Sequence, residues 1–178
     1  DTTNIYYIKS FNNFKKLYCN WYYYPKVFDG VNLKDIPKNV DLNYNLDIGL
    51  MYGAVCDYLG WGFLEGGKLM GLSSYGKTNQ NLPSLLVKNS LYGNMNLFNP
   101  SQTLNDKFYP IIKEAYQNPS SSIAKDLAYV TQQSLEKIIY NRVKQALSLY
   151  PTSNIVLSGG CSMNVVNNYK LKKKFPNI

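Results

Sequence analysis

The sequence predicts an α/β protein, and three consecutive features near its end predict it. An apolar helical pattern over residues 122–150 comes first, a β-branched run at residues 155–157 follows, and two glycines then precede a helix-like segment. Helix, buried strand, glycine turn and helix in this order are typical of a sheet layered with helices. The 178 residues are enough for one domain with a core, or for parts of two lobes.

The composition excludes several classes of protein. The chain is 45% hydrophobic and 17% charged, as ordinary globular domains are, and no apolar run is long enough to span a membrane. Three widely spaced cysteines, Cys19, Cys56 and Cys161, argue against a disulfide framework and favour a cytoplasmic setting. The absence of histidine excludes histidine metal sites and Ser–His or Cys–His pairs built from this chain alone.

The formal charge of +8 has two interpretations. A non-enzymatic basic module that binds nucleic acid is one, and a set of solvated lysines is the other. The densest cluster, Lys170-Leu-Lys-Lys-Lys174, ends a predicted helix, where cations complement the helix dipole. No arginine-rich stripe or stacked-aromatic motif accompanies it, so solvated lysines are the favoured interpretation.

The first elements along the chain are predicted strands. Residues 4–8 and 16–24 are rich in Tyr, Ile and Trp and flank a polar Ser10-Phe-Asn-Asn13 break, which predicts a hairpin. Residues 25–46 contain two prolines and scattered Asn and Asp, which predict a loop or an insertion.

A helix is predicted from Asp47, as its cap, to Leu59, with Gly60 just past its end. Gly49 and Gly53 lie one turn apart on it and indicate either close packing or a ligand near the backbone. Its predicted buried face consists of Ile48, Met51, Tyr52, Val55 and Leu59.

Residues 60–76 contain six glycines. This density suggests a backbone that follows a tight path through a site, with a flexible surface loop as the alternative. The interleaved Leu69, Met70 and Leu72 favour burial over a surface loop.

The second half begins with weaker signals. Residues 81–100 suggest an amphipathic segment followed by a hairpin, and residues 103–117 suggest a helix. The clearest helix follows Pro119 and serines 120–122 and ends at Pro151. Its predicted apolar face is Ala124, Leu127, Ala128, Leu135, Ile138, Ile139, Val143, Ala146 and Leu147.

Gly159 and Gly160 form the candidate anion cradle. Glycine lets the backbone approach a ligand closely, and the first amides of the following helix point at negative charge. Asn164, expected on the first turn of that helix, either binds the ligand or braces the loop. From the residues alone, ligand contact and a simple tight turn are equally compatible.

Four stretches together resemble one family. They are Gly49-Leu-Met-Tyr-Gly-Ala-Val-Cys-Asp-Tyr-Leu-Gly-Trp61, Gly67-Lys-Leu-Met-Gly-Leu-Ser-Ser-Tyr-Gly76, the helix with Asp126, Ala128, Gln132 and Glu136, and Leu157-Ser-Gly-Gly-Cys-Ser-Met-Asn-Val-Val-Asn167. In order and spacing they are similar to motifs of the O-carbamoyltransferase family, which includes the nodulation-factor, tobramycin and cephem carbamoyltransferases. The match covers residues 47–76 and 124–176 well, and residues 25–46 and 80–118 hardly at all.

The resemblance implies an actin-like (ribonuclease H-like) ATPase fold with two lobes. We expect a fragment in which residues 1–120 end the first lobe and residues 121–178 begin the second. It also implies a biosynthetic reaction in which carbamoyl phosphate and ATP yield a carbamoyl-adenylate. The carbamoyl group then passes to a free hydroxyl of a small acceptor, a sugar or natural product. No membrane or nucleic-acid partner is expected, and a homodimer stays open.

The resemblance also implies roles for single residues. Gly159, Gly160 and Asn164 would contact the nucleotide. Ile48 and Gly49 would bind carbamoyl phosphate through helix-start amides, although simple capping by Asp47 explains them too. Lys68 would neutralise phosphate, or be a solvated lysine.

The remaining candidates have equally plain alternatives. Gly71 and Gly76 would shape the path of the chain, and Tyr75 would face the acceptor or simply pack. Cys161 is expected to be a packing residue. Asp57 would be a base only if buried in a cleft, and otherwise lies on a solvated helix face. No catalytic residue is identified.

Family members use a bound metal, usually iron, held by two upstream histidines and a downstream aspartate. Those ligands are expected outside this chain, and this fragment alone is expected to be inactive. The alternative enzyme is a member of the tRNA threonylcarbamoyl-transfer family, which shares the fold and the Gly-Gly-Asn turn. The Met-Gly-Leu-Ser-Ser-Tyr-Gly run argues against that alternative.

Overall fold

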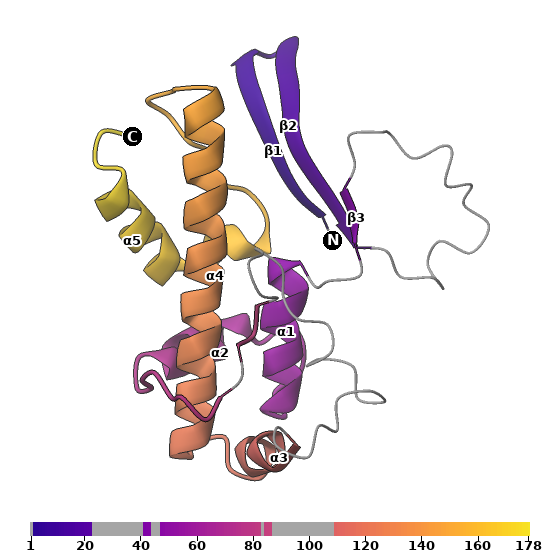
Figure 1. Cartoon of the computed structure of the whole chain (residues 1–178), viewed down its shortest axis with the longest axis vertical. Helices are drawn as coiled ribbons and strands as arrows, with labels where there is room; N and C mark the ends of the chain where they lie inside the picture. The colour runs from indigo at the N-terminus through magenta and orange to yellow at the C-terminus, as the bar shows by residue number, and fades with distance from the viewer. Residues whose placement is uncertain (1, 23–40, 44–46, 83, 87–108) are drawn as a thin grey trace, which may run out of the picture.

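The computed structural model describes residues 2–22, 41–43, 47–82, 84–86 and 109–178, and these residues form a mixed α/β structure. A long helix, α4, is its axis (Figure 1). Helices α1, α2 and α3 surround the N-terminal half of α4, whereas α5 and the β1–β2 hairpin lie toward its C-terminal half. The predictions for residues 25–40, 44–46 and 87–108 lie outside the described residues.

The predicted N-terminal hairpin is confirmed. Strands β1 (Thr2–Ser10) and β2 (Asn13–Tyr22) pair antiparallel around a turn at Phe11 and Asn12, within the polar break that the sequence indicated. A third strand, β3 (Asp41–Asn43), pairs parallel with the end of β2. The sequence interpretation of residues 41–43 as loop is therefore wrong, because their pairing partner lies about twenty residues away and leaves no local pattern.

Helix α1 (Ile48–Tyr58) begins and ends as predicted. The Asp47 carboxylate accepts a hydrogen bond from the Ile48 amide at 2.7 Å. At the other end Gly60 has φ 72°, its amide donates to the Asp57 carbonyl, and the Trp61 amide donates to the Cys56 carbonyl. This Schellman arrangement needs a residue in the left-handed region, which glycine adopts without strain.

Helix α2 (Gly66–Ser73) replaces the tight backbone path predicted for the glycine-rich segment. Leu69 is buried as expected, and α2 packs against α4. The short helix forms despite two glycines in its first turn because its apolar side has a core to contact. On α1, a β-carbon at Gly53 would lie 2.4 Å from the Phe63 ring, so packing explains this glycine.

Helix α3 (Tyr109–Gln117) agrees with the later part of the helix predicted at residues 103–117. Helix α4 (Ser122–Leu149) follows, and the Ser121 hydroxyl accepts a hydrogen bond from the Ala124 amide at its start. The predicted apolar face is buried as far as Ile138. Beyond that point Ile139, Val143, Ala146 and Leu147 are only half-buried, because α1, α2 and α3 cover the first part of the helix.

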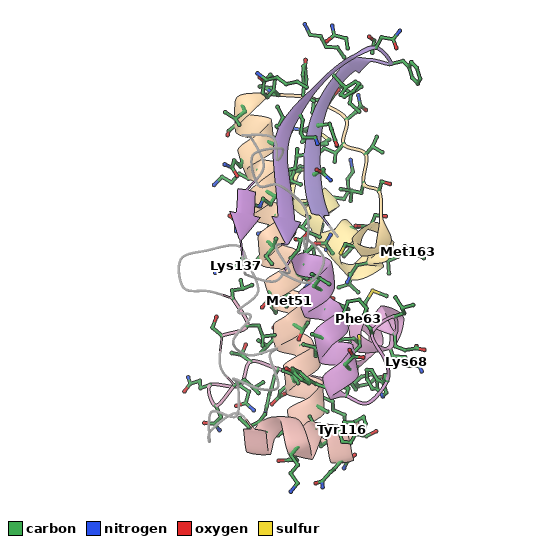
Figure 2. The ribbon with its side chains drawn as sticks, turned by 90° about the vertical axis from the view of Figure 1, so that its right-hand side faces the viewer. Met51, Phe63, Lys68, Tyr116, Lys137 and Met163 are labelled. Atoms are coloured by element: carbon green, nitrogen blue, oxygen red, sulfur yellow. The ribbon has the colours of Figure 1, made fainter. Side chains whose placement is uncertain are left out.

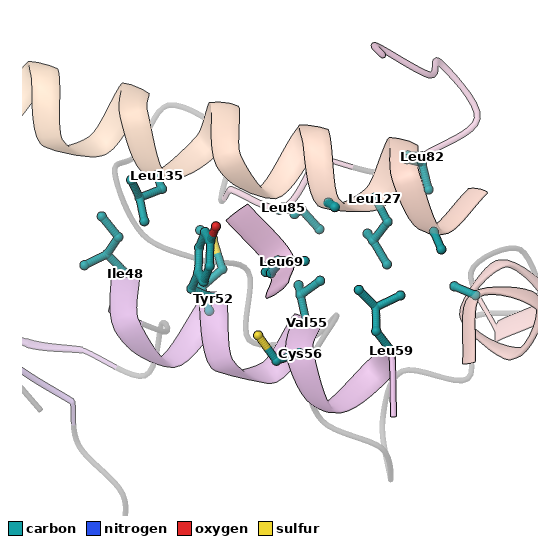
Figure 3. Packing of buried hydrophobic residues seen from close by; sticks show 14 of the residues in the cluster. Ile48, Tyr52, Val55, Cys56, Leu59, Leu69, Leu82, Leu85, Leu127 and Leu135 are labelled. Carbon is teal, nitrogen blue, oxygen red and sulfur yellow. The ribbon is translucent and has the colours of Figure 1, made fainter. Parts of the chain in front are cut away.

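The core lies between α1 and α4 (Figure 3). Val55 and Leu59 of α1 point toward Leu127 of α4. The five residues predicted to form the buried face of α1 are all buried. Leu69, Leu82, Leu85, Leu86 and Ala115 complete this core from the neighbouring segments.

The predicted strand at residues 155–157 is not formed in the structure. These residues are irregular, and the side chain of Val156 is 90% exposed. A strand requires a neighbour to complete its hydrogen bonds, and the described sheet has the order β1-β2-β3 without this segment. The helix expected at once after the glycines is also delayed: a 3₁₀ turn, Gly160–Met163, comes first, and α5 (Val165–Lys174) follows.

Candidate functional site

The Gly-Gly turn has a backbone that favours glycine at its first position. Gly159 has φ 91° and ψ 174°, in a region that residues with a β-carbon rarely adopt. The Ser162 amide and hydroxyl both donate to the Gly159 carbonyl, at 3.0 and 2.6 Å. No atom lies within 4 Å of where a β-carbon would stand on Gly159 or Gly160. Hydrogen bonds from Ser162 therefore close the turn, while the space beside Gly159 and Gly160 is free of other protein atoms.

Asn164 is the N-cap of α5 and is 7% exposed. The sequence predicted Asn164 on the first turn of the helix, whereas the structure places it one residue before the helix begins. Its Oδ1 accepts a hydrogen bond from the Asn167 amide at 2.9 Å. The Asn168 side chain also donates to the Ser162 carbonyl at 2.7 Å, which ties the 3₁₀ turn to α5. In this structure Asn164 braces the loop.

A buried polar network lies behind the turn, and Gln132 of α4 is its centre. Asn164 Nδ2 donates to Gln132 Oε1 at 2.9 Å, and Gln132 Nε2 donates back to Asn164 Oδ1 at 3.1 Å. The Tyr52 hydroxyl of α1 donates to the same Gln132 oxygen at 3.0 Å. Gln132, Asn164 and Tyr52 are each less than 8% exposed. Three elements far apart in sequence therefore meet at one side-chain amide.

The network ends at an ion pair on the surface. Gln132 Nε2 also donates to Glu136 Oε1 at 2.9 Å, and Lys170 Nζ of α5 contacts both Glu136 oxygens at 2.9 and 2.8 Å. Lys170 belongs to the lysine cluster singled out in the sequence. Another member, Lys173, lies over the Tyr169 ring at 4.6 Å. These contacts support the interpretation of the cluster as part of the helix surface.

The start of α1 lies beside the Gly-Gly turn. A β-carbon on Gly49 would stand 3.8 Å from the Cys161 sulfur. The structure thus brings together two segments that the sequence assigned to different ligands. The Ile48 amide is already engaged, since it donates to Asp47. Any anion at this end of α1 would meet the Asp47 carboxylate nearby.

Cys161 is half-buried and packs against the core, as predicted. Burial raises the pKa of the Cys161 thiol, and the Asp47 carboxylate raises it further. A thiol with a raised pKa is a poor nucleophile at neutral pH. Burial likewise raises the pKa of Tyr52 above its ordinary value, with the Cys56 thiol adding to the shift, so the Tyr52 hydroxyl remains a hydrogen-bond donor.

Lys68 lies on α2, and no contact joins it to the Gly-Gly turn. Its Nζ is 3.2 Å from Glu65 Oε2, and the side chain is 58% exposed. Figure 2 labels Lys68 on α2 and Met163 of the 3₁₀ turn. In this structure Lys68 is a solvated lysine in a local ion pair. Asp57 is also exposed, as expected of a solvated helix face.

Gly71, Tyr75 and Gly76 were predicted to shape the chain or to face the acceptor. Of these, Gly76 occupies a position where the structure requires a glycine. A β-carbon there would lie 2.0 Å from the Lys125 carbonyl oxygen of α4. Gly71 faces open space, and Tyr75 is 76% exposed. Neither approaches another predicted site residue through a described contact.

Asp126 anchors the segment after Gly76. It is 6% exposed, and its two carboxylate oxygens accept hydrogen bonds from the Lys77 amide and the Asn79 side chain, both at 2.9 Å. In the sequence, Asp126, Gln132 and Glu136 stood out only as part of a family pattern. The sequence does contain a signal for the role of Gln132. This residue interrupts the apolar stripe between Ala128 and Leu135, and a polar side chain buried there needs hydrogen-bond partners.

Two further findings concern the described residues only. Within them, no group of three or more Cys, Asp or Glu side chains could hold a metal ion. Nor does any helix in these ranges combine the length and apolar character that crossing a bilayer requires.

Comparison with known protein families identifies a matching family model. The family model described as the carbamoyltransferase N-terminus matches residues 14–178. Neither a curated protein nor a solved structure matches the chain significantly. The matched region covers the Gly-Gly turn, the helix with Gln132 and the start of α1. The chain therefore belongs to the carbamoyltransferase family.

Proposed function

We propose that the Gly-Gly turn of this chain binds the phosphates of ATP in an actin-like carbamoyltransferase. In this proposal carbamoyl phosphate and ATP yield a carbamoyl-adenylate, and a hydroxyl of a small acceptor then takes the carbamoyl group. The observation that supports it best is the geometry of the turn. Gly159 and Gly160 are open to solvent, while Asn164 and Gln132 brace the turn from the buried side. Backbone amides at such a turn can approach phosphate oxygens closely.

The second part of the site would be the start of α1. Its proximity to Cys161 places a helix N-terminus beside the proposed phosphate cradle. Helix starts favour anions, which suits the phosphate of carbamoyl phosphate. Because Asp47 already engages the Ile48 amide, the amides available to this anion would be those that follow, beginning with Gly49.

The metal implied by the family does not fit the described residues. They offer no cluster of three ligands, and the chain has no histidine. We therefore derive no step through a metal, and the residues described here would supply phosphate binding only.

ATP binding is the first test. Gly160→Leu places a side chain in the open space of the turn, and the matched control Gly67→Leu places the same side chain in open space on α2. Equilibrium dialysis with labelled ATP should show at least about tenfold weaker binding for Gly160→Leu, which corresponds to about 1.4 kcal/mol. The control should bind like the unaltered protein. Equal binding by both variants would contradict the assignment.

Carbamoyl transfer is the second test. The full-length protein, with the metal ligands expected outside these residues, is incubated with ATP, labelled carbamoyl phosphate and a panel of sugars. Carbamoyl phosphate loses its phosphate to water and gives carbamate, whose oxygen attacks the α-phosphate of ATP and displaces pyrophosphate. The acceptor hydroxyl then attacks the carbamoyl carbon and releases AMP. We expect inorganic phosphate, pyrophosphate, AMP and a labelled carbamate ester in the presence of one acceptor. Release of ADP would exclude the adenylate route, and transfer to tRNA-linked adenosine would favour the tRNA-modifying family instead.

A further inference from the structure

We infer that Gln132 is a positioning residue that holds the Gly-Gly turn in register with the start of α1. The inference rests on the proposed binding of nucleotide at that turn. Gln132 itself is 2% exposed, and its side-chain amide hydrogen-bonds to Tyr52, Asn164 and Glu136. It would act through Asn164 on one side and Tyr52 on the other.

The Gln132 amide has one orientation. A side-chain amide has two donor hydrogens and an oxygen that accepts two hydrogen bonds. Here Oε1 accepts from Tyr52 and from Asn164, and Nε2 donates to Asn164 and to Glu136. Both donor hydrogens and both acceptor positions of the Gln132 amide are therefore occupied. A rotated amide would point donors at donors, so the network specifies where the Asn164 side chain lies.

The core alone does not require an amide at this position. Gln132 lies between Ala128 and Leu135 on the apolar face of α4, where an unbranched apolar side chain of similar length would fill the same space. Replacing a whole buried hydrogen-bonded group by apolar side chains of the same shape can be nearly neutral, whereas removing Gln132 alone would leave its partners unsatisfied. Orientation is therefore the property that Gln132 adds.

The orientation joins the two proposed phosphate sites. Tyr52 follows Gly49 by about one helical turn, and Gly49 faces Cys161 in the turn after Gly160. Asn164 caps α5 and follows the same turn. The start of α1 and the Gly-Gly turn are thus joined twice, by packing at Cys161 and by hydrogen bonds through Gln132. A loss of the amide would remove the second connection and leave the first.

The test compares Gln132→Met with Thr131→Val in the whole chain. Thr131 is its fully buried neighbour on α4, and its hydroxyl donates only to the Leu127 carbonyl one turn earlier. The probe is an ATP analogue with a methylene bridge between the α- and β-phosphates, which blocks adenylate formation. Gln132→Met should bind it about tenfold more weakly, as expected for a displaced hydrogen-bonding loop. Thr131→Val should bind it normally.

A second measurement separates positioning from stability. The affinity for the analogue is measured with and without saturating carbamoyl phosphate. The coupling ratio is the affinity for the analogue with carbamoyl phosphate divided by the affinity without it. If the two sites are held in register, this ratio differs from one in the unaltered protein and approaches one in Gln132→Met and in Tyr52→Phe. A purely structural role would lower the melting temperature without altering this ratio.

The failures are distinguishable. If the unaltered protein does not bind the analogue, the proposed function fails and this inference fails with it. If the unaltered protein binds the analogue and Gln132→Met binds it as tightly as Thr131→Val, only the positioning role is wrong. A ratio of one in the unaltered protein would exclude the link between the two sites.

Discussion

Gly76 shows how one residue without a side chain allows the segment after α2 to lie against α4. A β-carbon there would overlap the Lys125 carbonyl oxygen and lie 2.8 Å from the Tyr129 β-carbon. Backbone cannot move aside as the end of a side chain can. The family-like Tyr-Gly ending of the α2 motif is therefore a packing requirement of α4 in this structure.

Gly76→Ala should lower the free energy of unfolding by about 2–3 kcal/mol, because the added methyl group forces α4 and the loop apart. Gly67→Ala is the matched control, since its methyl group enters open space on a helix and should stabilise by up to about 1 kcal/mol. Urea titrations followed by circular dichroism measure both. Similar values for the two variants would show that the contact at Gly76 is not tight.

Cys56 makes stability depend on pH in the alkaline range. Its side chain is fully buried, and burial, followed by the charge of Asp57, raises its pKa from 9.0 to about 11. Between these pH values the unfolded chain loses the thiol proton while the folded chain keeps it. The free energy of unfolding therefore falls as the pH rises from 9 to 11, by something on the order of 2 kcal/mol from this group.

Urea titrations at pH 8.5 and pH 11 should show this effect as a difference between two proteins. The many tyrosines titrate in both the unaltered protein and Cys56→Ala, so the smaller loss in Cys56→Ala isolates the thiol. Equal losses in the two proteins would mean that the folded thiol ionises normally.

At the scale of elements, the helices with local signals were predictable. Asp47, Gly60 and Ser121 sit at the termini where capping chemistry puts them, and the apolar face of α1 is buried in full. The failures share a physical cause. Residues 41–43 form a strand and residues 155–157 do not, because pairing depends on a partner distant in sequence.

The candidate site was predictable only in part. The glycines of the turn and Asn164 stand out in the sequence, yet the contact between Gly49 and Cys161 and the Gln132–Asn164 pair depend on tertiary packing. Within the glycine-rich segment, the tight backbone path predicted for residues 66–73 is a helix instead, whereas Gly60 and Gly62 have positive φ and Gly76 packs tightly on α4. The number of glycines indicates only how freely the backbone can bend. The helix forms because it buries Leu69 against the core.

The loop after α2 depends on α4 through Asp126. Asp126→Ala removes two hydrogen bonds to the segment 77–79 and should lower the free energy of unfolding by about 2–3 kcal/mol. Asp57→Ala, on the exposed face of α1, should change it by less than about 0.5 kcal/mol. Thermal and urea unfolding measure both, and a small effect at Asp126 would assign the loop's position to packing alone.

At the scale of the molecule, Tyr150 joins the hairpin to the helices. The Tyr7 ring stacks on the Tyr150 ring at 4.7 Å, and Lys15 Nζ donates to the Tyr150 hydroxyl at 2.8 Å. Figure 1 shows the hairpin beside the C-terminal half of α4. Two other aromatic side chains of the hairpin, Phe11 and Phe14, are 95% and 62% exposed.

Tyr150→Ala should therefore loosen the hairpin while leaving the core between α1 and α4 intact. Limited trypsin digestion should cut faster after Lys9, Lys15 or Lys16, with a melting transition within a few degrees of the unaltered protein. Leu149→Ala is the control, because Leu149 is 61% exposed and adjacent. If both variants are cut at the same rate, the ring contact does not position the hairpin.

Within the described residues, hydrogen bonds anchor the Gly-Gly turn at its downstream end. Asn164 joins its downstream end to the buried network, whereas residues 155–158 make no hydrogen bond to the described part of the chain. A ligand that orders those four residues would lose about 1–2 kcal/mol for each of them in backbone entropy. A strand that forms backbone hydrogen bonds with residues 155–158 before the ligand binds would remove this entropy loss from ligand binding. If the turn binds phosphate as proposed, ordering of residues 155–158 would therefore tune its affinity.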